Sequence, residues 1–292
     1  MATNKQVRDR LHALKNQFDE LNVGKDALLV LIDDAELPEA VYNSNAIENS
    51  TLTLADTEKI LLEAELSVDA SPREIFEAKN LARVSEYMRA HAKVQELTKE
   101  TILSLHKMLI TSINDSIAGR FRAQHEYVRV WTHIAPAPEH VERMVDEALS
   151  EYASDHETYV HDKVALFHLE FEHIHPFCDG NGRIGRVLMN WQLAWLGYPP
   201  VIIRDKEKSL YYAGFPAYRD KKHTKPMEKV LTLALTESLP TRIAHLPAAK
   251  IMRLSNYAKK EGKSASSLIN AARRQNIPAF REKGIWKIPV EI

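Results

Sequence analysis

A short run of the chain, from His175 to Arg186, brings together residue types that act on phosphates. His175 carries an imidazole that titrates near neutral pH, so it could remove the proton of a hydroxyl group. Asp179 offers a carboxylate, and proteins hold Mg²⁺ with one or two carboxylates together with phosphate oxygens. Arg183 and Arg186 share a helix face, and their planar guanidinium groups suit phosphate oxygens. The run therefore contains the parts of a polyphosphate site with its own base.

Gly180, Asn181 and Gly182 lie between the carboxylate and the arginines. A helix interior disfavours such a sequence, because each glycine costs about 1 kcal/mol relative to alanine. Apolar residues return at helical spacing after it: Ile184, Val187, Leu188, Trp191, Leu193 and Leu196. We therefore expect a tight turn that opens a buried helix. The free backbone N–H groups at such a helix start, approached closely through glycines, form a cradle for phosphates.

A zinc site is an alternative interpretation of the same region. Its ligands would be His168, His173 and His175, with Glu170 or Glu172. Their spacing is not His-Glu-x-x-His, and no cysteine pair assists. Each residue of the run also has an ordinary structural explanation when taken alone. Only the phosphate interpretation explains why all of them occur together.

The run His175-Pro-Phe-x-Asp-Gly-Asn-Gly-Arg-x-x-Arg186 resembles the signature of the Fic family of protein nucleotidyltransferases. Nine specified positions match without a gap, which makes the match far more specific than a lone glycine motif. The resemblance implies transfer of AMP from ATP to a hydroxyl side chain of a target protein, which can be the enzyme itself. It also implies Mg²⁺ as the cofactor. Other donors, such as UTP or a nucleotide-linked choline, stay open because the base pocket selects the donor.

The resemblance also implies a role for each residue of the motif. His175 is the base for the target hydroxyl, and Asp179 holds Mg²⁺. The residues Gly180, Asn181 and Gly182 cradle the phosphates. Arg183 contacts the phosphates near the reacting centre, and Arg186 contacts the γ-phosphate. Tyr212 belongs to an aromatic pair, Tyr211 and Tyr212, expected to border the nucleotide, although core packing explains the pair equally well.

A second motif lies ahead of the first. Ser44, Glu48 and Asn49 follow the pattern Ser/Thr-x-x-x-Glu-Gly/Asn within an expected helix over residues 36–49. Alone it would be an ordinary surface helix, with Ser44 and Glu48 on one face. Beside the main motif it resembles the inhibitory helix of Fic proteins. That resemblance implies that Glu48 pairs with Arg186, occupies the place of the γ-phosphate and misaligns the α-phosphate. It leaves open that Glu48 also supports removal of AMP from a target.

The composition indicates a mainly helical chain. Apolar residues make up 45% of the 292 residues, only nine are glycine, and strand-like alternation is scarce. Pro38 is expected near a helix start, and Pro240 at the end of a helix over residues 225–239. The expected fold is mainly α. The resemblance implies a Fic-type helical bundle with a short β-hairpin flap and a small C-terminal winged helix-turn-helix.

Residues 125–134 are the clearest strand-like run before the C-terminal tail. Tyr127, Val128, Val130 and Trp131 give it high β propensity. A plain hairpin that covers the core is one interpretation. The family resemblance implies another, in which a flap at this place pairs with an extended segment of the target protein.

The C-terminal tail is basic. From Ala249 onward the chain carries ten Lys and Arg residues and three Glu, a net +7, whereas the whole chain carries −1. The tail is expected to form a helix capped by Ser255, a second helix from about Ser264 to Arg274, and a hairpin. It loosely resembles excisionase and MerR-like DNA-binding modules, in which Arg273 and Arg274 would contact DNA. A protein-docking module is the alternative.

We expect three regions: a helical region over residues 1–95, a catalytic core over 96–244 and the basic module over 245–292. The chain opens on polar residues, no apolar run approaches ~20 residues, and Cys178 is its single cysteine. These features predict a cytoplasmic protein with no membrane span and no internal disulfide. A homodimer is left open. The second function considered is a DNA-binding regulator whose nucleotide site acts as a sensor.

Overall fold

The computed structural model describes residues 4–63, 70–130, 132–247, 250–274 and 276–290 of the chain. These residues divide into two compact units. The first is Leu37–Leu231, and the second joins Asn4–Glu36 to Thr232–Ile292. Most of the described chain is helical, so the expected mainly α fold is confirmed. The predicted division into three regions stays a prediction.

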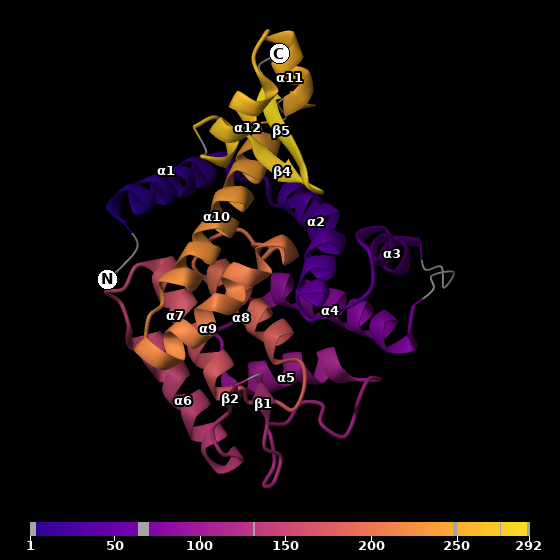
Figure 1. The fold of residues 1–292 in the computed structure, drawn as a ribbon, viewed down its shortest axis with the longest axis vertical. Coiled ribbons are helices and arrows are strands. Elements are labelled where there is room, and N and C mark those ends of the chain that lie inside the picture. The colour runs from indigo at the N-terminus through magenta and orange to yellow at the C-terminus, as the bar shows by residue number, and fades with distance from the viewer. Residues whose placement is uncertain (1–3, 64–69, 131, 248–249, 275, 291–292) are drawn as a thin grey trace. The chain divides into compact units, whose positions relative to one another are not determined.

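The first unit is a helical bundle (Figure 1). In chain order it contains the later part of α2 (Asp26–Ile47), α3 (Leu54–Glu58), a π-helical turn (Lys59–Glu63), α4 (Pro72–His91), α5 (Lys99–Ile110), β1 (Arg129–Val130), β2 (His133–Ile134), α6 (Pro138–Ser154), α7 (Val160–Ile174), α8 (Asn181–Trp195), a 3₁₀ turn (Asp205–Glu207), α9 (Lys208–Lys221) and the start of α10 (Lys225–His245). Helix α7 packs against α6, α8 and α9, and α4 packs against α5 and α8. Trp191, Phe171 and Phe177 are among the fully buried side chains of the core.

Helix starts in this unit follow their capping residues. Ser71 caps α4, with Pro72 at the first helical position and Glu74 completing a capping box. Thr53 and Asp56 form the same arrangement at α3. Helix α3 continues directly into the π-helical turn, and residues 64–69 lie outside the described part of the chain.

Pro38 and Pro240 lie inside helices. Our expectations that Pro38 lies near a helix start and that Pro240 ends a helix are therefore wrong. Helix α2 already begins at Asp26, and α10 continues past Pro240 to His245. A proline inside a helix costs about 3 kcal/mol, because it removes one hydrogen bond and crowds the preceding turn. Contacts beyond each proline offset this cost. Val41 and Ile47 are fully buried in α2, whereas in α10 Ala244 is 2% exposed and the buried Arg242 pairs with Asp33 and Glu36.

The strand-like run before α6 is divided into two short strands. β1 and β2 pair antiparallel, with Arg129 opposite Ile134 and Val130 opposite His133. Tyr127 and Val128 precede β1, and the Val128 carbonyl accepts a hydrogen bond from the Ala135 N–H at 3.0 Å. Trp131 lies outside the described residues.

The second unit contains α1 (Lys5–Asn22), the beginning of α2, the later part of α10, and a C-terminal module. That module consists of β3 (Lys250–Arg253), α11 (Leu254–Lys260), α12 (Ala265–Arg273), β4 (Phe280–Glu282) and β5 (Ile285–Val290). Its antiparallel sheet has the order β3-β5-β4. Lys283 and Gly284 turn between β4 and β5 with positive φ angles, as expected of a tight hairpin.

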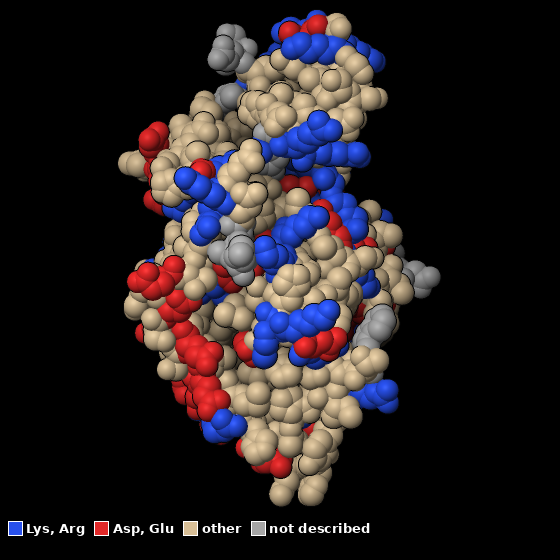
Figure 2. Space-filling model, turned by 60° about the vertical axis from the view of Figure 1, so that its left-hand side comes forward, with Lys and Arg blue, Asp and Glu red and all other residues tan. Residues whose placement is uncertain are grey.

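The C-terminal module has its own small core, which includes Leu254, Leu268 and Ile288. Ser264 caps α12 as expected. Ser255 does not cap α11, because β3 leads directly into that helix and Arg253 occupies the N-cap. Figure 2 shows blue basic groups on the exposed surface of this module, at the top of the view.

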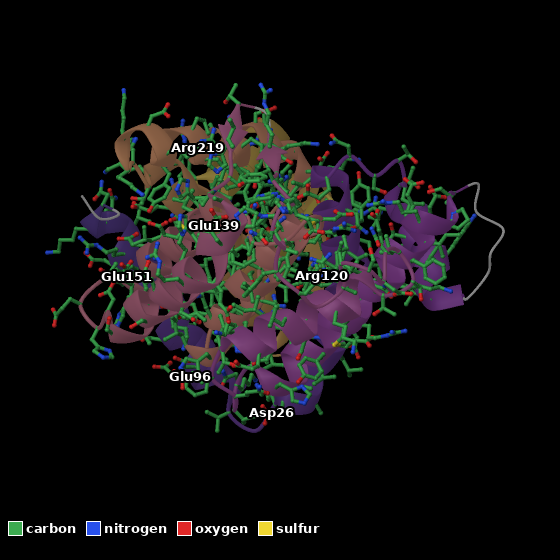
Figure 3. The ribbon with its side chains drawn as sticks, turned by 90° about the horizontal axis from the view of Figure 1, so that it is seen from below. Asp26, Glu96, Arg120, Glu139, Glu151 and Arg219 are labelled. Carbon is green, nitrogen blue, oxygen red and sulfur yellow. The ribbon has the colours of Figure 1, made fainter. Side chains whose placement is uncertain are left out.

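Residues that precede and follow α5 lie apart from one another. Seen from below, Glu96, ahead of the helix, lies away from Arg120, which follows it (Figure 3). The chain after α5 contacts the loop that begins at His175, where the Arg122 N–H donates to the Pro176 carbonyl at 2.9 Å.

Within the described part of the chain, no helix combines the length and apolar character needed to cross a lipid bilayer.

Candidate active site

The site is built on the loop between α7 and α8. His175 ends α7 in the left-handed conformation, with φ of 49°, which is uncommon for a residue other than glycine. Its N–H donates to the Phe171 carbonyl, and its own carbonyl accepts from Arg122 Nε, both at 2.9 Å. Arg122 is 4% exposed and also donates to the carbonyls of Ile174 and Pro136. The backbone of His175 is therefore fixed from both sides.

The loop after His175 is closed by the Asn181 side chain, which bonds with the backbone of Phe177. Asn181 accepts from the Phe177 N–H at 2.9 Å and donates to the Phe177 carbonyl at 2.8 Å. The Phe177 ring stacks on His106, with ring centroids 3.6 Å apart. His106 accepts from the Gly119 N–H at Nδ1, which leaves Nε2 to donate to the Asp179 carbonyl at 3.0 Å. Burial lowers the pKa of His106 to about 4, so the ring that donates to the Asp179 carbonyl is uncharged at neutral pH.

Helix α8 begins directly at this loop, and its first turn faces a hollow of 430 Å³. We call it the phosphate hollow. Gly180 has a φ of 80°, and an added Cβ would lie 3.1 Å from Leu109 and Ile110 side-chain atoms. Gly182 leaves room for the Glu48 carboxylate, which an added Cβ would overlap. His175 and Arg183 also line this hollow. A free helix start with a cationic side chain is a ready binding site for phosphate.

Asp179 lies on the same hollow within a network of charges. Its carboxylate accepts from Arg73 Nη2, from Arg183 Nη2 at 3.2 Å, and from the Gly180 N–H at 2.6 Å. Glu77 joins the two arginines, at 3.0 Å from Arg73 Nε and 3.1 Å from Arg183 Nη1. The Asp179 side chain is 32% exposed and that of Arg73 57%, so Arg73 can move away at little cost.

A zinc site is not found in the described residues, where no three His, Cys, Asp or Glu side chains form a metal-binding group. Asp179 presents a carboxylate to the phosphate hollow from the loop before α8, and Glu48, Glu74 and Glu77 also line the hollow. A hard carboxylate ligand fits Mg²⁺, which takes its remaining ligands from phosphates and water. Zinc would instead need three or four protein ligands.

The segment around Glu48 contacts Arg186 directly. Arg186 Nη2 donates to Glu48 Oε1 at 2.9 Å and to the Ser44 carbonyl at 2.8 Å, and its Nε donates to Ser44 Oγ at 2.9 Å. Arg186 Nη1 donates to Tyr211 Oη at 3.2 Å. Burial alone would lower the pKa of Arg186, but its contacts with Tyr211 and Glu48 raise it above the ordinary value. All three nitrogens of the Arg186 guanidinium thus donate hydrogen bonds to protein groups.

Asn49 and Tyr212 hold the same segment in place. Asn49 has a φ of 69° and ends the helix, and its Oδ1 accepts from Lys208 Nζ at 2.8 Å. Tyr212 Oη donates to the Ile47 carbonyl at 3.0 Å. Burial raises the pKa of Tyr212 to about 12, so the hydroxyl stays a donor at neutral pH.

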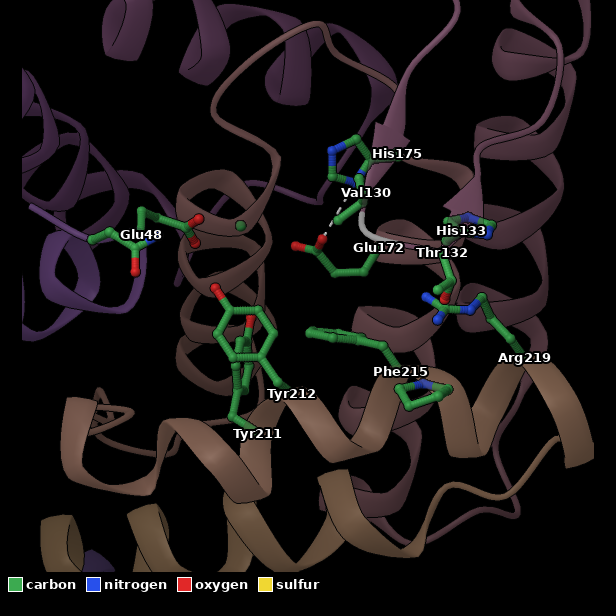
Figure 4. Close-up of a pocket in the computed structure, with 13 residues that line it drawn as sticks. Glu48, Val130, Thr132, His133, Glu172, His175, Tyr211, Tyr212, Phe215 and Arg219 are labelled. Atoms are coloured by element: carbon green, nitrogen blue, oxygen red, sulfur yellow. Dashed lines mark ion pairs between the residues drawn. The ribbon is translucent and has the colours of Figure 1, made fainter.

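A second hollow, of 380 Å³, adjoins the phosphate hollow at His175 and Gly182. We call it the aromatic hollow. Figure 4 shows Tyr211, Tyr212 and Phe215 on α9 forming its aromatic wall, opposite the hairpin residues Val130, Thr132 and His133. Arg219 lies at its far end. An aromatic wall with a few polar groups suits a planar ligand. Of the expected flap residues, Val130 lines both hollows and Tyr127 is 63% exposed.

From the sequence, Tyr211 is predicted only as part of an aromatic pair, and two arginines that shape the site, Arg73 and Arg122, are not predicted. Tyr211, rather than Tyr212, contacts Arg186, and Tyr211 also bonds with His168 Nε2 at 2.8 Å. Arg73 and Arg122 gave no recognisable pattern, because their partners are 106 and 53 residues away.

The two arginines predicted to contact DNA lie in the C-terminal module. Arg273 ends α12 and Arg274 is its C-cap, and both are exposed.

Comparison with known proteins gives a consistent result. Residues 96–193 match the model of the Fic/DOC family. Protein adenylyltransferase Fic of Drosophila sechellia is 34% identical over 263 residues, which cover 85% of this chain and 51% of that protein. The Drosophila erecta protein of the same name is 34% identical over 296 residues, covering 96% and 58%. The chain thus spans about half the length of these curated relatives.

Solved structures agree. A Fic-domain-containing signaling protein from Bacteroides thetaiotaomicron has a TM-score of 0.74 at 25% identity, covering 82% of this chain and 97% of that one. A Fic family protein from Desulfovibrio desulfuricans has a TM-score of 0.66 at 22% identity, covering 99% and 97%, and so shares the fold.

Proposed function

Because the chain belongs to the Fic/DOC family, we propose that it transfers AMP from ATP to a hydroxyl side chain of a target protein. One observation carries this proposal: His175 lies where the phosphate hollow at the start of α8 meets the aromatic hollow. A nucleotide that spans both hollows would bring its α-phosphate to this histidine. The target is a Ser, Thr or Tyr of another protein or of the enzyme itself.

The reaction follows from these positions. His175 takes the proton of the target hydroxyl, whose oxygen forms a bond with the α-phosphorus of ATP. The bond from that phosphorus to the bridging oxygen breaks, and pyrophosphate leaves. Arg183, Arg186 and the N–H groups of the α8 start stabilise the charge that develops on the phosphates. The aromatic hollow holds the base and so selects among nucleotide donors.

Mg²⁺ is proposed as the cofactor, held by Asp179. When bound, the ion would offset phosphate charge and orient the leaving group. Asp179 supports this role because its carboxylate lies on the phosphate hollow and stays partly exposed. Arg73 and Arg183 contact that carboxylate in its present state, and the more exposed Arg73 would yield to the ion.

The segment Ser44–Asn49 is proposed to inhibit transfer. Glu48 and Ser44 occupy the guanidinium of Arg186, which the γ-phosphate needs. With that position taken, ATP would bind with its α-phosphate out of line with the attacking oxygen.

Mass spectrometry of the Glu48→Gly protein, incubated with Mg²⁺ and ATP or UTP in turn, tests the transfer. We expect a mass increase of one AMP with ATP. The increase should disappear in Glu48→Gly/His175→Ala and persist in Glu48→Gly/His140→Ala, since His140 is an exposed histidine on α6. No added nucleotide with either donor, even with candidate target proteins present, would contradict the proposal.

The C-terminal module supports a second proposed activity, DNA binding. The observation in its favour is the net +7 charge on a compact helix-turn-helix-like unit with basic groups exposed (Figure 2). Such a surface meets phosphates through counterion release, so binding would weaken steeply with salt. A docking role for a partner protein, or for a second copy in a homodimer, would leave the full chain without affinity for duplex DNA even at low salt.

A further inference from the structure

A buried carboxylate lies beside the proposed base. Glu172 is three residues before His175 on α7, and its side chain is 9% exposed. Its Oε2 lies 3.6 Å from His175 Nδ1 (Figure 4). The figure shows the carboxylate pointing to the imidazole from the floor of the aromatic hollow. The two side chains therefore form a pair at the point where chemistry is proposed to occur.

The fold makes space for this carboxylate. An added Cβ on Gly185, in α8, would lie 2.8 Å from Glu172 Oε1 and 2.8 Å from His168 Cε1. Because only hydrogen fits at this position, the backbone of α8 can approach both side chains closely. A larger residue would push Glu172 away from its present place.

One oxygen of the Glu172 carboxylate makes no hydrogen bond with the described residues. This oxygen, Oε1, is also buried. His168 is neutral, because burial lowers its pKa to about 4. Burial alone would raise the pKa of Glu172, but its interaction with His175, helped by the charge of Arg186, lowers it below the ordinary value. A buried ionised carboxylate is costly unless a positive charge appears beside it.

We propose that Glu172 is the positioning residue of His175: it accepts a hydrogen bond from Nδ1–H and stabilises the imidazolium that forms during transfer. This inference rests on the proposed function. With the Nδ1 proton directed at Glu172, Nε2 is left to take the proton of the target hydroxyl. After pyrophosphate leaves, the imidazolium returns that proton to solvent, and Glu172 itself stays ionised. The 3.6 Å separation is expected to shorten in the complex with nucleotide, as catalytic hydrogen bonds commonly do.

The test compares Glu172→Gln with Glu172→Asp, both in the Glu48→Gly protein. For Glu172→Gln we expect kcat for AMP transfer to fall about 10²-fold or more, with the Kd for ATP unchanged. For Glu172→Asp we expect partial recovery, because the charge is restored at a greater distance. Glu170→Gln is the matched control, since Glu170 lies on the same helix and contacts Tyr218 instead. A kcat for Glu172→Gln equal to that of its parent would overturn the inference.

A second measurement needs neither activity nor a stable Glu172→Gln protein. Nitrogen NMR shifts of the His175 ring in the Glu48→Gly protein should show that the neutral form carries its proton at Nδ1. A neutral ring protonated at Nε2 would overturn the inference. If the Glu48→Gly parent transfers no AMP at all while its ring shows the Nδ1 proton, the proposed function has failed rather than the pairing of Glu172 with His175.

Discussion

At the scale of single residues, Arg186 has two competing partners. In the present structure it donates to Glu48 Oε1 and to Ser44 Oγ, both at 2.9 Å. In the proposed complex it would donate to the γ-phosphate. Since one guanidinium fork cannot satisfy both partners, the free energy of its contact with the helix opposes productive binding of ATP.

Removing the competing carboxylate should therefore release the activity. Glu48→Gly is expected to raise auto-modification by about 10²-fold, the scale at which small errors in alignment slow a transfer. Ser44→Ala, which removes one of the hydrogen bonds to Arg186, should raise it less. The initial rate of labelling from radioactive ATP measures both. Equal rates in the original protein and in Glu48→Gly would argue against inhibition by this contact.

A stability prediction concerns Gly185. Alanine there has the better helix propensity, yet its Cβ would lie 2.8 Å from Glu172 and His168 atoms. We expect Gly185→Ala to lower the free energy of unfolding by about 1 to 3 kcal/mol, because overpacking outweighs the propensity gain. Gly214→Ala is the control, since the nearest atom to its Cβ would be the flexible end of Met227 at 3.3 Å, with the other neighbours at ordinary contact distance. Urea denaturation of both variants, followed by circular dichroism, decides the matter, and equal stability would contradict the expectation.

At the scale of elements, the first turn of α4 connects the inhibitory segment to the active-site loop. Glu74 accepts from the Thr51 N–H at 2.7 Å and from Ser50 Oγ at 3.2 Å, directly after the residues that hold Arg186. Its neighbour Arg73 pairs with Asp179. The start of one helix thus anchors both the segment that follows α2 and the proposed metal carboxylate.

Acid should weaken this anchor. The backbone hydrogen bond from Thr51, with further hydrogen bonds from Thr51 and Ser71, lowers the pKa of Glu74 from 4.5 to about 2. A lowered pKa in the folded state means that the contribution to stability is present above pH 4.5 and is lost as the pH falls toward 2. Glu74→Gln should therefore be less stable than the original protein at pH 7, with a difference that shrinks below pH 4.5. Glu86→Gln, at an exposed position of α4, serves as the control. A difference that does not change with pH would contradict this account.

The sequence predicted elements where a local pattern defined them. Ser264 marked the start of α12, and the glycines at Gly180 and Gly182 marked the turn before α8. It failed where tertiary burial decided the outcome, as at Pro38 and Pro240. Within the site, a single linear motif carried most of the chemistry. The contact of Tyr211 with Arg186 and the role of Arg122 were not predicted, because both depend on partners elsewhere along the chain.

At the scale of the whole molecule, charge is unevenly divided along the chain. The basic tail carries +7 while the chain as a whole carries −1. Replacing both Arg273 and Arg274 by alanine should lower the affinity of the full-length protein for duplex DNA. The slope of log K against log salt should fall by about 2, because each arginine is expected to neutralise one phosphate. Electrophoretic mobility shifts at several salt concentrations measure this. AMP transfer, followed in parallel, should not change. A DNA affinity equal to that of the original protein would show that these arginines do not contact DNA.

The account as a whole depends on which phosphate of the nucleotide ends on the protein. The Glu48→Gly protein should be incubated with Mg²⁺ and ATP labelled either at the α-phosphate or at the γ-phosphate, beside the Glu48→Gly/His175→Ala protein. We predict stable label on Glu48→Gly from the α-labelled ATP only, and none on the doubly substituted protein. Label from the γ-phosphate, or equal label on both proteins, would contradict the transfer of AMP by His175.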